Sequence, residues 1–113
     1  MELLGTIEPA SADWATGKAE WIRLIEAHPR LTKVAPKQGV NPFTKSPLEY
    51  RPSPDVALIV SSSSDVGMIH WAMDQSRHLV VWSTAGAEGE VRNVADDVAT
   101  RLGWKFVAYF PAA

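Results

Sequence analysis

The stretch from Val56 to Ser83, VALIVSSSSDVGMIHWAMDQSRHLVVWS, constrains the fold more than any other part of the chain. It holds the densest apolar material, arranged as three runs separated by two short polar segments. Short runs rich in β-branched and aromatic residues, bounded by turn residues, are typical of β-strands. The stretch therefore predicts a meander of three antiparallel strands, joined by four-residue turns at 62–65 and 74–77.

These two turns fix which side chains share a face, because successive residues of a strand point to opposite sides of the sheet. The resulting aromatic face comprises Val56, Leu58, Val60, Ile69, Trp71, Met73, His78, Val80 and Trp82. The second face comprises Ala57, Ile59, Ser61, Met68, His70, Ala72, Leu79, Val81 and Ser83. We expect the bulkier aromatic face to meet the core. The second face is smaller and more polar but still half apolar.

Helical periodicity flanks the meander on both sides. Apolar residues recur at helical spacing near 18–28, where Pro29 ends the pattern, and again over 88–102, where Gly103 follows as a C-terminal cap. Residues 104–110 alternate as a strand does, and residues 1–11 suit a short edge strand or an ordered arm. The order predicts a two-layer α+β domain, with a mainly antiparallel sheet of four to six strands and at least one helix on its aromatic face.

Residues 29–54 form a proline-rich, basic connector within a chain of 113 residues that fits a single domain. The connector holds six of the eight prolines and has a local charge of +4, which leaves −6 on the rest of the chain. Asn41-Pro42-Phe43-Thr44 predicts a turn inside it, since Asn and Pro occupy the positions that type I turns favour. The connector is too apolar for a disordered linker, so we expect it to pack on the surface.

Composition excludes several kinds of chemistry. The chain has no cysteine, which rules out disulfides and thiolate sites, and it contains neither a G-x-S-x-G nor a P-loop motif. His70 and His78 fall on opposite faces in the predicted register, so we expect no metal and no cofactor. Asp96 and Asp97 diverge on their helix, as solvated residues do. No apolar run approaches the ~20 residues of a membrane helix, and we expect a cytoplasmic protein.

These absences favour a small non-enzymatic protein-binding module, similar in size and charge to immunity or antitoxin-type proteins or to an accessory protein. Two helices cannot readily cover both sides of a sheet, so the second face calls for a partner, a second copy of the chain, or the connector folded over it. Homodimerisation is the simplest form of this hypothesis. The candidate partner-binding residues are Ile59, Met68, His70, Leu79 and Val81 on the second face, and Lys37, Phe43, Lys45 and Arg51 on the connector.

Two other classes of function remain open at the level of the sequence. One is an enzyme or small-ligand-binding domain with a pocket between the connector and the sheet, where His70, Arg51 and His28 would meet. No catalytic residue can be assigned to it. The other is weak nucleic-acid binding through the basic connector, although a net charge of −2 argues against a dedicated nucleic-acid binder.

Overall fold

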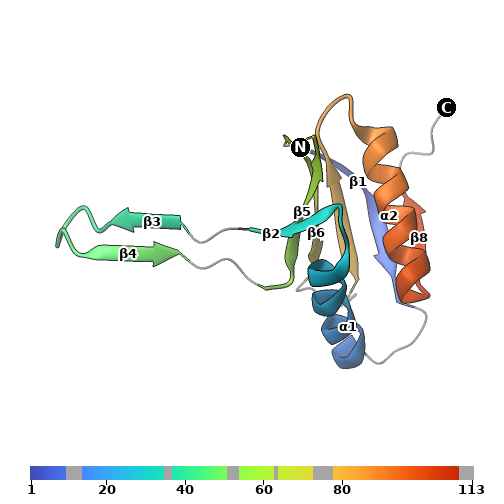
Figure 1. Cartoon of the computed structure of the whole chain (residues 1–113), viewed down its shortest axis with the longest axis horizontal. Helices are drawn as coiled ribbons and strands as arrows, with labels where there is room; N and C mark the ends of the chain where they lie inside the picture. The colour runs from blue at the N-terminus through green and yellow to red at the C-terminus, as the bar shows by residue number, and fades with distance from the viewer. Residues whose placement is uncertain (10–13, 35–36, 51–53, 63, 73–77, 110–113) are drawn as a thin grey trace.

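The computed structural model of the chain describes residues 1–9, 14–34, 37–50, 54–62, 64–72 and 78–109. It confirms an α+β domain with two helices, a six-stranded antiparallel sheet and a separate two-stranded sheet (Figure 1). The elements in chain order are β1 (Glu2–Glu8), α1 (Trp14–Ala27), β2 (Leu31–Lys33), β3 (Lys37–Val40), β4 (Pro47–Tyr50), β5 (Val56–Ser61), β6 (Ser64–Trp71), β7 (Leu79–Ser83), α2 (Glu88–Leu102) and β8 (Lys105–Ala108).

The six-stranded sheet has the order β2-β5-β6-β7-β1-β8, so the predicted meander β5-β6-β7 lies in its middle. The strand at the N-terminus is not an edge strand. β1 pairs with β7 on one side and with β8 on the other, so the edges of the sheet are β2 and β8. The C-terminal strand pairs with the sheet as expected, but through β1 rather than directly with the meander.

Both helices pack on the same face of this sheet, which we call the covered face (Figure 1). Helix α1 contributes Trp21 and Ile25, and Trp21 also donates a 2.9 Å hydrogen bond from Nε1 to the carbonyl of Asp55. Helix α2 contributes its predicted apolar stripe. The buried core that results comprises Leu4, Ile7, Trp21, Ile25, Leu31, Ala57, Ile59, Ile69, Trp71, Leu79, Val81, Val91, Val94, Ala95, Val98 and Ala99.

One glycine lets α1 pack closely and another ends α2. Helix α1 begins four residues earlier than the predicted segment and contains Gly17, where a Cβ would come within 2.8 Å of the Trp104 ring. Gly103 caps α2 as predicted, with φ of 72° in the left-handed region that favours glycine. Its N–H donates to the Thr100 carbonyl, and Trp104 N–H donates to the Ala99 carbonyl, which satisfies the end of the helix.

The predicted register of the meander is wrong at both connections, by one residue beyond the bulge in the first strand pair and by one residue in the second. Ser61 pairs with Ser64 beside a bulge at Ile59/Val60, so the first connection is shorter than four residues. The predicted turn at 74–77 lies outside the described residues, but Trp71 pairs with Leu79 where the prediction paired it with Val80. Because a slip of one residue turns a strand over, the predicted faces are correct for β6 and inverted for β5 and β7.

The covered face therefore carries Ala57, Ile59, Ile69, Trp71, Leu79, Val81 and Ser83, all buried. Most of the residues expected in the core from β5 and β7 point to the other side. The prediction that helices lie on the bulkier face is wrong. The smaller residues of β5 and β7 lie beneath the helices, and the larger ones face away from them.

The connector contains regular secondary structure. Its middle forms the β3–β4 hairpin, which we call the arm (residues 37–50), and the arm projects away from the edge of the sheet that holds β2 (Figure 1). The arm makes the molecule elongated, with extents of 50 × 34 × 25 Å. Sequence analysis anticipated the turn in the arm but not the hairpin around it.

Candidate functional site

The side of the sheet opposite both helices is the main candidate surface, and we call it the uncovered face. Cross-strand pairing places two rows on it, one running Val107–Thr6–Val80–His70–Val56 and the other Leu3–Trp82–Met68–Leu58–Thr32. Most of these side chains are apolar and half-buried. Within the described residues, no helix or strand lies over this face (Figure 1).

His70 and Trp82 form the polar centre of the uncovered face. Their rings are stacked, with centroids 6.4 Å apart and planes inclined by 15°. The Trp82 Nε1–H donates to Nε2 of His70 at 2.9 Å, so Nε2 carries no proton. The proton of the neutral ring is therefore on Nδ1, which lies 3.3 Å from the Trp71 carbonyl oxygen. The pair satisfies two polar groups and leaves the face without a charge at its centre.

The structure divides the candidate residues of the predicted second face into two groups. Met68 and His70 lie on the uncovered face and are half-buried. Ile59, Leu79 and Val81 lie on the covered face and have no exposed surface, so the chain itself occupies the positions where a partner was expected. Their places on the uncovered face are taken by neighbours from the same strands, of which Leu58 and Trp82 are the bulkiest.

The tip of the arm is built around Asn41. Its side-chain Oδ1 accepts hydrogen bonds from the N–H groups of Phe43 (2.9 Å) and Thr44 (3.3 Å). Its backbone closes the loop in both directions, donating to the Ser46 carbonyl and accepting from the Lys45 N–H. Lys45 adopts φ of 61°, a left-handed conformation that is uncommon for a residue with a side chain. These contacts give the tip a defined shape.

The arm exposes apolar side chains that a globular chain would normally bury. Phe43 at the tip is 93% exposed, Val40 is 62% exposed and Leu48 is 49% exposed. Of the other candidate residues of the connector, Lys45 is exposed, Lys37 begins β3, and Arg51 lies outside the described residues. Large exposed aromatic side chains are a feature of binding surfaces.

Two basic residues of the connector are already paired with acidic residues of the body. Lys33 bonds Glu26 at 2.6 Å, a contact that lowers the pKa of Glu26. Arg30 donates to the Val60 carbonyl at 2.8 Å and forms an ion pair with Glu90. A hydrogen bond from Ser61, followed by that ion pair, lowers the pKa of Glu90. These contacts fasten the base of the connector to the body and are structural.

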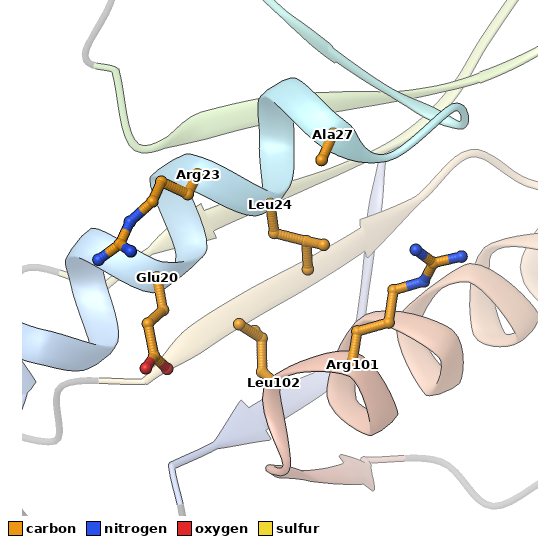
Figure 2. A pocket seen from close by; sticks show the side chains of 6 residues that line it. All are labelled: Glu20, Arg23, Leu24, Ala27, Arg101 and Leu102. Atoms are coloured by element: carbon orange, nitrogen blue, oxygen red, sulfur yellow. The ribbon is translucent and has the colours of Figure 1, made fainter.

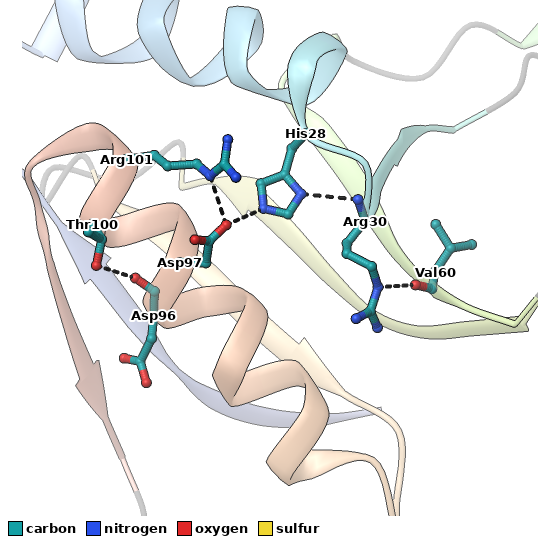
Figure 3. A network of polar contacts seen from close by, with 7 residues as sticks. All are labelled: His28, Arg30, Val60, Asp96, Asp97, Thr100 and Arg101. Atoms are coloured by element: carbon teal, nitrogen blue, oxygen red, sulfur yellow. Dashed lines mark hydrogen bonds and ion pairs between the residues drawn. The ribbon is translucent and has the colours of Figure 1, made fainter.

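A buried histidine links the two helices, which sequence analysis did not anticipate (Figure 3). His28 follows α1 and is almost fully buried. Its Nδ1 accepts from the Arg30 N–H at 3.0 Å, so its Nε2–H donates to Asp97 on α2 at 2.6 Å. Arg101 donates to the same carboxylate oxygen at 2.8 Å. The hydrogen bond from His28, with a further contribution from Arg101, lowers the pKa of Asp97.

This histidine–aspartate pair does not form a catalytic site with a third group. Figure 3 shows Asp96 pointing away from His28, and the nearby Thr100 hydroxyl donates to the Asp96 carbonyl at 2.8 Å. Both nitrogens of His28 are occupied by hydrogen bonds within the fold. Asp96 is solvated as expected, whereas Asp97 fixes α2 to the end of α1. The sequence signal for this contact was a single histidine, His28, directly after a helix. A histidine that is buried there needs a hydrogen-bond partner.

A depression lies between the two helices, with a volume of about 410 Å³ (Figure 2). Its lining consists of Glu20, Arg23, Leu24, Ala27, Arg101 and Leu102. Figure 2 shows Leu24 and Leu102 facing one another across it, with the Arg23 and Arg101 guanidinium groups pointing to different sides. The charged groups do not converge on one position, which a site for a small polar ligand requires.

The pocket expected between the connector and the sheet is not formed by the residues named for it. His28 lies on the helical side of the sheet, whereas His70 lies on the uncovered face. In the described ranges, no group of three or more His, Cys, Asp or Glu side chains is close enough to hold a metal ion. Among the same residues, no helix is both long and apolar enough to cross a membrane.

Fold and surface together define a two-layer α+β protein in which, among the described residues, helices cover one face of the sheet only. No protein-family model, curated protein or solved structure matches the chain. Its function must therefore be argued from its own surfaces.

Proposed function

We propose that the protein is a non-enzymatic protein-binding module that uses the uncovered face of its sheet. The observation that carries this proposal is the placement of both helices on one face, which leaves the half-buried side chains of Leu58, Met68 and Trp82 on a face that no described helix or strand covers. Contiguous apolar surface of this kind marks interaction sites in proteins that are otherwise well packed.

The chemistry of the surface supports a protein partner. Its centre is apolar and aromatic and its one polar pair, His70 and Trp82, is internally hydrogen-bonded. Interface centres have this composition, being rich in aromatic residues and methionine and poor in charge. The simplest partner is a second copy of the chain, and an immunity- or antitoxin-type role, in which a small protein occludes another, would use the same surface.

The test compares wild-type protein with Met68→Glu, which places a charge in the middle of the uncovered face. Ala19→Glu is the matched control, because it adds the same charge at an exposed position of α1. Size-exclusion chromatography with light scattering at micromolar concentration measures self-association. Affinity capture from native lysate, followed by mass spectrometry, measures other partners with each variant as bait.

We expect Met68→Glu to lose the association or the captured partner and Ala19→Glu to keep it. The loss should be at least about tenfold in affinity, since a buried charge without a partner is costly at the centre of an interface. A Met68→Glu protein that keeps the oligomeric state and every specific partner of the wild type would contradict the proposal. Circular dichroism confirms that each variant is folded.

A further inference from the structure

Two apolar surfaces of this chain are not covered by any described residue, and their dimensions and charges are complementary. One is the uncovered face of the sheet, and the other is the arm with Val40, Phe43 and Leu48 exposed. We propose that the arm of one copy lies across the uncovered face of a second copy, in a symmetric dimer with two such contacts. This inference rests on the proposed function and names the partner and the element that binds.

The arm is too small to gain much stability from its own contacts. A two-stranded hairpin is at best marginally stable in water, because it buries little apolar surface. The arm pairs only four residues on each strand and exposes its largest apolar side chain, Phe43, almost completely. Its tip is nevertheless ordered by the hydrogen bonds of Asn41. An aromatic side chain held outward on a defined loop loses little conformational entropy on binding, which favours affinity.

The arm does not lie over the sheet to which it belongs (Figure 1). It leaves the body at the β2 edge and points away from both faces of its own sheet (Figure 1). In a two-fold dimer the same patch pair occurs twice, so one symmetry operation covers both arms and both faces. A second copy of the chain therefore covers both the arm and the uncovered face.

The dimensions of the two surfaces agree. The arm spans residues 37–50, or about seven residues along each side, and reaches about 23 Å at a rise of about 3.3 Å per residue. Six strands spaced about 4.8 Å apart give a sheet about 24 Å wide. An arm laid across the strands would therefore extend over the width of the face.

Charge favours this arrangement over the packing of two faces against each other. The arm has a net charge of +1, from Lys37 and Lys45 against Glu49, which leaves −3 on the rest of the chain. An arm on the partner's body brings opposite charges together. Two faces in contact would instead bring two acidic bodies together, and like charges at an interface are unfavourable.

A complementation experiment tests the inference. Phe43→Asp disrupts the binding surface of the arm but leaves the uncovered face intact. Met68→Glu disrupts the uncovered face but leaves the arm intact. In the proposed dimer every contact joins one arm to one face, so each variant alone has no intact contact. An equimolar mixture forms a heterodimer with one intact contact. Light scattering on wild type, on each variant and on the mixture measures the four states, with Phe43→Leu as the conservative control.

We expect dimeric wild type and Phe43→Leu, monomeric single variants with affinity reduced at least about tenfold, and partial recovery of dimer in the mixture. A dimeric Phe43→Asp with a monomeric Met68→Glu would overturn the role of the arm and leave the proposed function standing as a face-to-face dimer. A dimeric Met68→Glu, or a monomeric wild type, would overturn the inference as well. In the monomeric case, lysate capture still tests the face separately.

A second measurement does not depend on a charged substitution in the sheet. The chain has no cysteine, so Phe43→Cys gives a single thiol at the tip of the arm that can carry a benzophenone photocrosslinker. Irradiation of a mixture of isotopically heavy and light copies should give crosslinks between copies, located in β5, β6 or β7. Crosslinks confined to one copy, or found on the helices, would overturn the inference.

Discussion

Met68 and Ile69 are neighbours in β6, yet they belong to surfaces with different roles. Ile69 is fully buried beneath the helices, whereas Met68 is half-buried on a face that nothing in the described part of the chain covers. The same strands thus supply both the core and the candidate interface. Both faces are apolar, but the helices cover only one of them in the described part of the chain. The effect of this cover on stability can be measured by substituting single residues on each face.

The largest contrast is expected from truncating these two neighbours. Ile69→Ala should lower the free energy of unfolding by about 2–5 kcal/mol, because it removes buried contacts and leaves a cavity beneath the helices. Met68→Ala should cost about 1 kcal/mol or less, since its side chain keeps part of its contact with water in the folded state. Urea unfolding at a fixed concentration low enough to keep the protein monomeric measures both. Equal losses would contradict the distinction between the faces.

A second contrast concerns the attachment of the helical layer. Asp97→Ala should destabilise the protein by about 1–2 kcal/mol at neutral pH, because it leaves the buried His28 Nε2–H without its acceptor. Asp96→Ala, one residue away on the solvated side of α2, should change stability by less than about 0.5 kcal/mol. Urea midpoints of the two variants against wild type report this difference. Similar midpoints for both variants would show that the link between the helices is dispensable.

The same aspartate gives a prediction for acid. Contacts with His28 and then Arg101 lower the pKa of Asp97 below its ordinary value of 3.8. Its contribution to stability is therefore complete above about pH 3.8 and is lost as the pH falls through the lower pKa of the folded state. Unfolding midpoints measured from about pH 6 to about pH 3 should fall less steeply for Asp97→Asn than for wild type. An unchanged slope would remove Asp97 from this role.

On the uncovered face, Trp82→Phe should cost less than about 1 kcal/mol in a monomer, because its hydrogen bond to His70 is partly accessible to water. By NMR, the Trp82 indole N–H resonance can be assigned as the one that disappears in the variant. In His70→Phe this resonance should shift, because the substitution removes its acceptor. A resonance that does not move in His70→Phe would place the Trp82 N–H on another acceptor.

The smallest effect on global stability is expected in the arm. Asn41→Ala should leave the unfolding free energy within about 0.5 kcal/mol of wild type, because the arm is remote from the core. Hydrogen exchange at the Phe43 amide should nevertheless become about five- to tenfold faster, since it loses its acceptor. Lys33 and Glu26, which pair at the base of the connector, provide an internal reference region that should not change.

Local patterns in the sequence predicted the elements well. The stripe of α2 and its glycine cap are contained in one stretch of chain, and a helix of period 3.6 can be recognised without knowing its neighbours. The turn around Asn41 is equally local, since its side chain bonds its own loop. The three strands of the meander were recognisable from their β-branched runs, and the structure confirms them.

The register was not predictable by the same means. Both faces of the meander are apolar, so hydrophobicity could not choose between them, and size suggested the wrong one. The covered face has small residues, including Ala57, Gly67 and Ser83, because the helices need room to approach. A Cβ on Gly67 would lie 2.9 Å from the Val91 side chain of α2. The helices contribute many of the large side chains of this core, so the sheet beneath them can carry smaller residues.

By itself, the sequence determined the composition of the chain, the two helices, the strands of the meander and the turn of the arm, because each depends on neighbouring residues. Only the tertiary structure decided which face of the sheet the helices cover, the pairing of β1 between β7 and β8, and the link from His28 to Asp97. These depend on contacts between residues far apart in the chain. The candidate interface also depends on such contacts, because the packing of the helices on one face determines which face stays uncovered.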